Sequence, residues 1–196
     1  MPPITQSRRL HLGCGRNALQ GWVNLDRVRL EGVDVVADLD DCRRTALPFP
    51  DNAFDEFLGV HVIEHLRDPL AFMQELHRIA APGAKAEFRL PYGSSDDAFE
   101  DPTHVRPYFL GSFHYFAQTT YWRADYGYRG DWQTDEVVLK MPASRYAGKT
   151  ADELLAEVMT ARNCVDEMQV RLHAVKPVRA PLKGPSHSAP VRFTVA

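Results

Sequence analysis

Five short apolar runs in the first half of the chain constrain its fold more than any other feature. Each run has four to seven residues and is bounded by Gly, Pro, Asn or Asp, the pattern of buried strands separated by turns. The runs are Arg8–Leu12, Trp22–Leu25, Val33–Ala37, Phe54–Val60 and Lys85–Leu90. We therefore expect five strands in this half.

The segment Asp68–Ala81, between the fourth and fifth runs, is typical of a helix. Asp68 can cap its start, Pro69 suits its first turn, and Pro82-Gly83 stops it. Its apolar face consists of Phe72, Leu76 and Ile79. A strand, a helix and a strand form a right-handed crossover, so we expect a parallel sheet that binds ligands at the carboxyl ends of its strands.

Two runs in the second half, Glu136–Met141 and Val165–Val175, alternate like strands and suggest an antiparallel pair. Between them, Thr150 can cap a helix over Ala151–Ala161. The fold class that follows is α/β: a Rossmann-like, seven-stranded, mostly parallel sheet with an antiparallel strand near the C-terminus and helices on both faces.

The region 91–135 interrupts this regular pattern with an aromatic-rich insertion. Twelve of the twenty aromatic residues lie between Tyr92 and Asp135, where they can cover a pocket or pack a small subsidiary core. The aromatic residues that we single out are Tyr108, Phe113, Tyr115, Phe116, Tyr121, Trp122 and Trp132. We expect one domain over 1–178 that includes this insertion, followed by a Pro-rich, basic and weakly ordered tail over 179–196.

Composition narrows the class of protein but names no partner. With 196 residues, 44% hydrophobic content and a formal net charge of -3, the chain can bury one core and carries no strong overall field. No apolar run is long enough for a signal peptide or a membrane span, so we expect a cytoplasmic protein. The three cysteines lack the spacing of a zinc site, and Glu64-His65 lacks a second histidine at helical spacing, so the sequence provides no support for a metal site.

A glycine turn directly after the first run indicates a nucleotide site. Gly13-Cys14-Gly15 permits a tight turn and a close approach of the backbone to a ligand. Asp26 and Asp38 end the second and third runs, where a carboxylate can accept hydrogen bonds from a ribose. Because Asp26 lies only eleven residues after Gly15, the helix between these runs must be short. Both acids could instead cap turns, but the glycine turn beside them favours a binding role.

Three motifs together resemble the class I S-adenosylmethionine-dependent methyltransferases, in particular the type 11-like group. The motifs are LGCG at Leu12–Gly15, PFPDxxFD at Pro48–Asp55 and HVxEH at His61–His65. The resemblance runs over about residues 8–92 and implies S-adenosylmethionine as the cofactor. It also implies that Gly13, Cys14 and Gly15 approach the methionine part, that Asp26 holds the ribose, that Asp38 and Leu39 meet the adenine, and that His61 lines the pocket. His11 stands where many members have an acid.

The acceptor chemistry points to the polar stretch Asp101–Tyr108 inside the insertion. Methyl transfer needs alignment, exclusion of water and, for a hydroxyl acceptor, a base. His104 is the candidate base and Asp101 can orient it, although Asp-Pro and Thr also form ordinary turns. The candidate substrate-binding residues are Arg106, Tyr108, His114 and Tyr115.

The nature of the acceptor stays open between several classes. The insertion has three Lys or Arg against seven Asp or Glu, which argues against nucleic acid and favours a small molecule or a glycan. Two other functions fit the same fold: a non-catalytic module that binds a cofactor or a partner, and an NAD(P)-dependent oxidoreductase. The sequence does not determine the oligomeric state.

Overall fold

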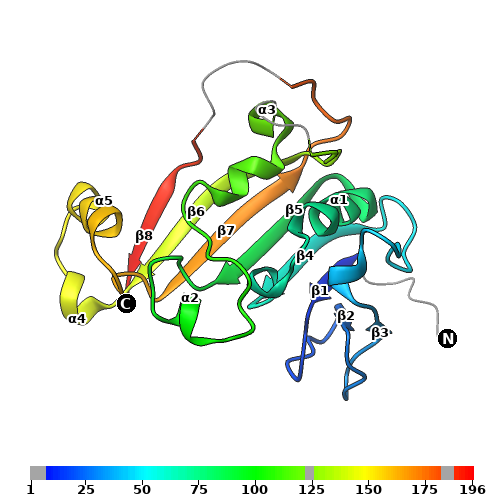
Figure 1. Cartoon of the computed structure of the whole chain (residues 1–196), viewed down its shortest axis with the longest axis horizontal. Helices are drawn as coiled ribbons and strands as arrows, with labels where there is room; N and C mark the ends of the chain where they lie inside the picture. The colour runs from blue at the N-terminus through cyan, green and yellow to red at the C-terminus, as the bar shows by residue number, and fades with distance from the viewer. Residues whose placement is uncertain (1–7, 122–125, 182–187) are drawn as a thin grey trace.

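The chain folds around one eight-stranded sheet with the strand order β3-β2-β1-β4-β5-β7-β6-β8 (Figure 1). The structure is a computed structural model that describes residues 8–121, 126–181 and 188–196. The strands are β1 Arg9–Leu12, β2 Val23–Asp26, β3 Val35–Val36, β4 Phe54–Val60, β5 Ala80–Leu90, β6 Trp132–Met141, β7 Glu167–Ala174 and β8 Val191–Val195. Trp122 and residues 182–187 of the expected tail lie outside the described residues.

The pairing confirms the expected parallel half and antiparallel pair. β1 pairs in parallel with β2 and β4, β2 with β3, and β4 with β5. β7 runs antiparallel to both β5 and β6. The carboxyl ends of β1 to β5 therefore meet at one edge of the sheet, which we call the carboxyl edge.

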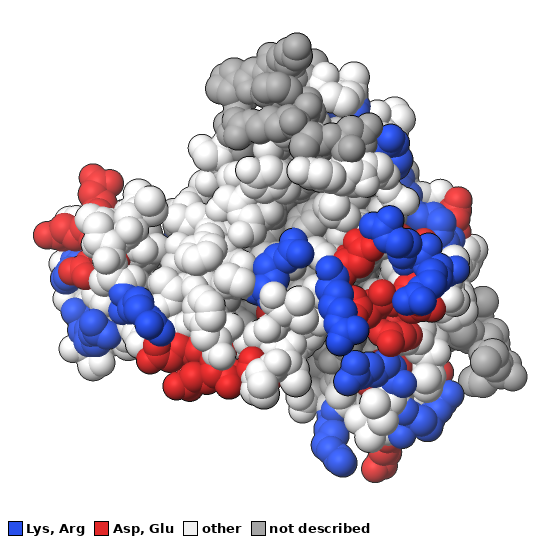
Figure 2. Space-filling view, in the orientation of Figure 1, with Lys and Arg blue, Asp and Glu red and all other residues white. Residues whose placement is uncertain are grey.

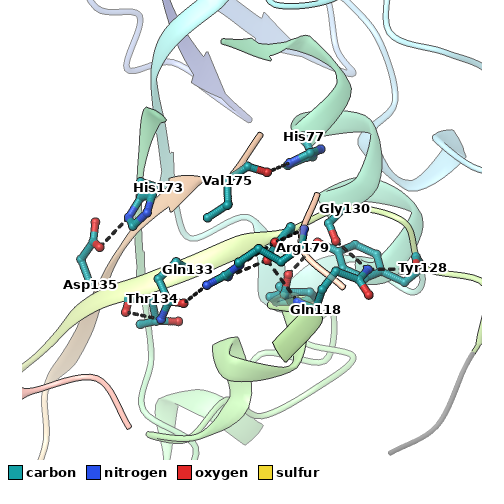
Figure 3. A network of polar contacts seen from close by, with 12 residues as sticks. His77, Gln118, Tyr128, Gly130, Gln133, Thr134, Asp135, His173, Val175 and Arg179 are labelled. Carbon is teal, nitrogen blue, oxygen red and sulfur yellow. Dashed lines mark hydrogen bonds and ion pairs between the residues drawn. The ribbon is translucent and has the colours of Figure 1, made fainter. Parts of the chain in front are cut away.

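The sheet has eight strands instead of the expected seven, because the expected tail supplies β8. β8 pairs in parallel with β6, and its alternate residues Val191, Phe193 and Val195 pack against the core. The chain before β8 is also held, since the Arg179 guanidinium pairs with the fully buried Asp131 at 2.7 Å and with Gln133 (Figure 3). The expectation of a weakly ordered tail over 179–196 is thus wrong for residues 179–181 and 188–196, because β8 pairs with β6 and both Arg179 and Arg192 pair with carboxylates of the domain.

Two helices have the capping chemistry that the sequence indicates. α1 spans Pro69–Ile79, and the Asp68 carboxylate caps it by accepting from the Ala71 amide. α5 spans Ala151–Thr160, with a capping box between Thr150 and Glu153. The other helices are single turns: η1 Leu39–Asp41, η2 Ile63–His65, α2 Asp97–Glu100, η3 Ser112–Phe116, α3 Gln118–Tyr121 and α4 Ala143–Tyr146. None of the helices in the described ranges has the length and apolar character of a membrane span.

The connection from β1 to β2 is shorter than expected. Residues 13–22 form turns and contain no helix, where the sequence suggested a helix of one or two turns. The close spacing of Gly15 and Asp26 therefore reflects a loop that returns directly to the neighbouring strand.

The two faces of the sheet differ over β5, β7 and β6. One face packs against α1 and the insertion (Figure 1), with Phe88, Phe113 and Tyr108 in ring contact. On β5, β7 and β6 the opposite face carries exposed or half-buried charged side chains paired with one another, so in the described residues no helix lies over this area. Alternation of polar and apolar residues in these strands is typical of a sheet with one solvated face.

The aromatic residues of the insertion mostly extend the main core. Tyr108, Phe113, Phe116, Tyr121 and Trp132 are buried and belong to the same apolar cluster as the strands. Tyr115 is 51% exposed. The insertion is thus the layer that covers one face of the sheet.

Candidate functional site

The carboxyl edge places the glycine turn against the segment that follows β4. Gly13 and Gly15 adopt φ values of 58° and 53°, the left-handed conformation that glycine tolerates best. A Cβ on Gly13 would lie 2.7 Å from Cγ2 of Val62, whereas one on Gly15 would meet nothing within 4 Å. Gly13 thus permits the turn after β1 to pack on the turn after β4, and Gly15 leaves open space.

Asp26 fastens the glycine turn to the end of β2. One carboxylate oxygen accepts from the Gly15 amide at 2.8 Å and the other from the Val28 amide at 2.9 Å. The Cys14 amide donates to the Leu25 carbonyl at 3.0 Å. Each carboxylate oxygen has a second lone pair, so Asp26 can hold the turn and still accept from ribose hydroxyls.

Asp38 lies at the neighbouring strand end, after β3. Its side chain caps η1 by accepting from the Asp40 amide at 3.0 Å, and the following Leu39 is buried in the core. The Ala37 amide donates to the Asp26 carbonyl at 3.1 Å, which joins the two strand ends. The three expected elements of a nucleotide cradle, Gly13–Gly15, Asp26 and Asp38, therefore lie at one edge.

His11 and Cys14 are directed inward at this edge. His11 is 4% exposed and its ring meets that of Trp22 edge-on at 6.4 Å. Burial lowers the pKa of His11, against the effect of a hydrogen bond with Asn24, and burial raises the pKa of the Cys14 thiol. Both side chains are therefore neutral near pH 7 and act as packing groups under the turn.

His61 lies at the end of β4 in a left-handed backbone conformation with φ 50°. Its side chain is about half exposed, and Nδ1 lies 3.3 Å from Oε1 of Glu64. The contact is an ion pair that is poorly aligned for a hydrogen bond. The neighbouring Glu64 carboxylate raises the pKa of His61, because it stabilises the protonated imidazole. A strained backbone at a strand end is typical of functional positions.

A second group of polar side chains lies directly beyond His61. Ligand atoms of Glu64, His65 and His104 all lie within 4.8 Å of one another, and we call these three residues the Glu64 cluster. The Val105 amide donates to the Glu64 carbonyl at 2.8 Å, which ties the chain after β5 to η2. Both Glu64 carboxylate oxygens and Nδ1 of His104 are buried and have no hydrogen-bond partner among the described residues.

Asp101, the predicted orienting group, acts on this cluster through Thr103. Oδ1 of Asp101 accepts from the Thr103 hydroxyl at 2.6 Å and from the Thr103 amide at 2.7 Å. The Thr103 hydroxyl lies 2.9 Å from Nδ1 of His65. Nε2 of His104 lies 3.9 Å from Oδ2 of Asp101, which is too long for a hydrogen bond.

The four predicted substrate-binding residues occupy different environments. Arg106 is exposed close to the cluster. Tyr108 is buried, its hydroxyl lies 3.4 Å from the Ile63 carbonyl, and burial raises its pKa. His114 accepts from the Ala189 amide at 3.2 Å and so faces the segment before β8, and Tyr115 is half exposed in η3.

Sequence reasoning missed the meeting of Glu64 and His65 with His104. The sequence does not show directly which strands are neighbours in the sheet. His61–His65 follows β4 and the 101–108 stretch comes after β5, and these strands are parallel neighbours whose ends share an edge. His104 comes thirty-nine positions after His65, so no spacing motif could reveal the pair.

Comparisons with known proteins agree with this geometry. The family model described as "Methyltransferase domain" matches residues 10–88, from β1 to the end region of β5. Ajmaline N-methyltransferase of Rauvolfia serpentina is 41% identical over 54 residues, which are 28% of this chain, and norajmaline N-methyltransferase of the same plant is 36% identical over 56 residues. The aligned part makes up only 19% of the length of each of these relatives.

Solved structures share the fold over most of the chain. A methyltransferase from Archaeoglobus fulgidus, whose title calls it SAM-dependent, has a TM-score of 0.57 at 14% identity and covers 86% of this chain and 87% of its own. A putative sarcosine dimethylglycine methyltransferase from Galdieria sulphuraria has a TM-score of 0.53 at 12% identity, with coverage of 86% and 78%. Residues 10–88 thus match the model of a methyltransferase domain, and the chain as a whole shares the fold of the two solved methyltransferases.

Proposed function

We propose that this chain transfers the methyl group of S-adenosylmethionine to a small-molecule or glycan acceptor. The observation that carries the proposal is the arrangement at the carboxyl edge, where Asp26 holds the Gly13–Gly15 turn in place next to Asp38 and His61. A turn fixed by its own hydrogen bonds loses little further freedom when it binds a ligand.

The assignment of cofactor contacts follows the strand ends. Gly13, Cys14 and Gly15 would face the methionine part, Asp26 the ribose, and Asp38 with Leu39 the adenine. His61 would line the pocket at the end of β4, between the cofactor and the Glu64 cluster. Because β1 and β4 are direct neighbours, the methyl donor and the cluster would be brought together at one edge.

The acceptor would bind on the side of the 101–108 stretch. His104 is our candidate for the residue nearest the reacting group, and Asp101 fixes the local geometry through Thr103. Arg106, exposed beside them, can attract an anionic or polar acceptor. On the face shown in Figure 2, charges of both signs are mixed over α1 and β1 to β3, and its centre is mostly uncharged, which supports a small or neutral acceptor over a polyanion.

The test is isothermal titration of the protein with S-adenosylmethionine and S-adenosylhomocysteine, repeated on Asp26→Ala. Hydrogen bonds to a carboxylate are worth roughly 1.5 to 3 kcal/mol, so the variant should bind about tenfold more weakly or worse. Asp55→Ala is the matched control, because Asp55 pairs with Arg8 at the opposite end of β4. This control should leave the affinity unchanged.

Three outcomes separate the proposal from its alternatives. If the wild type binds neither ligand, the proposal is wrong, and a change of NADH fluorescence on mixing would favour an oxidoreductase. If the wild type binds but no acceptor in a panel of amines, hydroxylated molecules and glycans is methylated, a non-catalytic binding module is favoured. Methylation of an acceptor that is lost with cofactor binding in Asp26→Ala supports the proposal.

A further inference from the structure

The Glu64 cluster combines burial with unmet bonding capacity. The Glu64 side chain is 3% exposed, yet neither of its oxygens accepts a hydrogen bond from the described residues. The His104 side chain is 7% exposed, and its Nδ1 is equally without a partner in the described parts of the chain. A buried carboxylate that accepts no hydrogen bond is costly, and the half-exposed His61, 3.3 Å from one Glu64 oxygen, does not satisfy this bonding capacity.

The hydrogen bonds of His65 determine which of its nitrogens is free to bind. The Thr103 hydroxyl has one proton, and its shortest contact, 2.6 Å, is with the Asp101 carboxylate. Towards His65 this hydroxyl is therefore an acceptor, and the Thr103 carbonyl, 3.3 Å from the same Nδ1, can only accept. Nδ1 of His65 must then hold the proton, which leaves the lone pair of the neutral ring on Nε2.

The same reasoning applies to His104. Its Nε2 faces Asp101 at 3.9 Å, so a proton on Nε2 is favoured, and the unpartnered Nδ1 then has the lone pair. One ring nitrogen of each histidine and one carboxylate oxygen of Glu64 lie within 4.8 Å of one another. Behind them, the Asp101–Thr103 pair orients His65 in the way that outer residues orient the histidine ligands of metal ions.

We propose that Glu64, His65 and His104 bind a divalent cation of the first transition row, such as Mn²⁺, Fe²⁺, Co²⁺ or Zn²⁺. Two imidazoles with one carboxylate suit these ions, whereas Mg²⁺ and Ca²⁺ prefer sites made of oxygen ligands alone. The ion would neutralise the Glu64 carboxylate and satisfy Nδ1 of His104. His61, 3.3 Å from Glu64, flanks the site on the cofactor side.

This inference rests on the proposed function and specifies how the acceptor would be activated. Three protein ligands leave coordination positions for an acceptor oxygen, and a bound ion lowers the pKa of an attached hydroxyl. The hydroxyl would release its proton to solvent, its oxygen would form a bond to the methyl carbon, and the bond from methyl to sulfur would break to give S-adenosylhomocysteine. The acceptor class is therefore a hydroxylated molecule, and His104 acts as a ligand in place of a free base.

The experiment measures metal binding directly. Protein freed of metal with a chelator is titrated with Co²⁺, followed by its visible absorption, and with Mn²⁺, followed by electron paramagnetic resonance; Mg²⁺ is the contrasting ion. We expect one metal site per chain. The metal affinity should fall more than about tenfold in His65→Ala and in His104→Ala. It should fall by about tenfold in Thr103→Val, which removes only the contact that orients His65. His173→Ala is the matched control, since His173 pairs with Asp135 away from the cluster.

Thermal unfolding of each sample with and without Co²⁺ separates loss of the site from loss of the fold. The wild type and His173→Ala should be stabilised by Co²⁺, and the cluster variants should unfold cooperatively but without this gain. The inference is overturned if the wild type does not bind Co²⁺ or Mn²⁺, or if binding survives in both histidine variants. Titration of the same samples with S-adenosylmethionine keeps the outcomes apart, because failure of metal binding alone leaves the proposed function intact.

Discussion

Two buried carboxylates in this protein have opposite surroundings. Asp131 is fully buried where the insertion meets the segment before β8, and it accepts from the Gln118 amide and from the Arg179 amide and guanidinium. Glu64 is nearly as deeply buried at the carboxyl edge, and its oxygens have no hydrogen-bond partner in the described residues. Burial alone would raise the pKa of Asp131, but the contacts with Arg179 lower it.

The difference in hydrogen-bond donors indicates a different role for each carboxylate. The donors around Asp131 come from Gln118 and Arg179, both labelled in Figure 3. The carboxylate therefore joins the insertion to the C-terminal segment and stabilises the fold. Among the described residues the Glu64 oxygens accept no hydrogen bond, and the nearest cationic group is His61 at 3.3 Å. This contrast with Asp131 is the basis of the metal site that we propose.

Removal of the charge at Asp131 should give the largest effect. Asp131→Asn leaves the partly buried Arg179 without its partner, and breaking such a pair costs about 3 kcal/mol. For a chain of this size, Tm should fall by roughly 10 °C. Asp51→Ala is the control, because its pair with Arg78 is 70% exposed on the Asp51 side and should contribute less than about 1 kcal/mol. Equal losses in the two variants would show that Asp131 has no special role.

The second prediction examines how rigidly the segment before Glu64 is held. In Gly13→Ala the new methyl group would lie 2.7 Å from Val62, in addition to the strain of a positive φ. We expect a loss of about 2 kcal/mol in the free energy of unfolding. Gly15→Ala has the same backbone strain but no clash and should lose about half as much. Denaturant unfolding measures both, and a smaller loss in Gly13→Ala than in Gly15→Ala would contradict the packing argument.

Much of the architecture could be predicted from local sequence. Asp68 and Thr150 cap the two longest described helices as expected, and each of the five apolar runs in the first half contains strand residues. These features depend on residues close in sequence, where hydrogen bonding and burial act directly. The β8 strand was missed because the four prolines and the cations of residues 176–196 suggested a tail, and because its partner strand β6 lies some fifty residues earlier.

The candidate site could be predicted only in part, for the same physical reason. Gly13, Asp26 and Asp38 each end a strand, so adjacency in a parallel sheet was enough to bring them to one edge. The position of His104 depends on how the insertion packs after β5, through contacts such as that of the Val105 amide with the Glu64 carbonyl. No spacing rule encodes such a contact.

The third prediction concerns stability as a function of pH beside Asp131. His77 is buried, Nε2 lies 3.0 Å from the Val175 carbonyl, and burial lowers its pKa below the usual 6.5. The unfolded chain therefore binds a proton at higher pH than the folded chain does. The free energy of unfolding should fall as the pH drops below 6.5, by at most about 1.4 kcal/mol per pH unit from this group.

His77→Gln isolates this contribution, because glutamine can donate to the same carbonyl but cannot be protonated. Urea unfolding between pH 7.5 and pH 5 should show a smaller pH dependence for the variant than for the wild type. An unchanged slope would mean that His77 is protonated in the folded state, and that the region around Asp131 tolerates a further buried charge.

The smallest expected effect is also the sharpest test of the contrast between the two carboxylates. Glu64→Gln is the same change of charge to amide as Asp131→Asn, but here the carboxylate accepts no hydrogen bond from the described residues and has the half-exposed His61 beside it. In chelator-treated protein the variant should therefore equal the wild type or exceed its stability by less than about 1 kcal/mol, because a buried amide costs less than an unpaired carboxylate. With Co²⁺ present the order should reverse, since only the wild type gains the free energy of metal binding. If metal-free Glu64→Gln loses as much free energy of unfolding as Asp131→Asn, Glu64 already has a structural partner. The two carboxylates would then have the same structural role in two places of the fold.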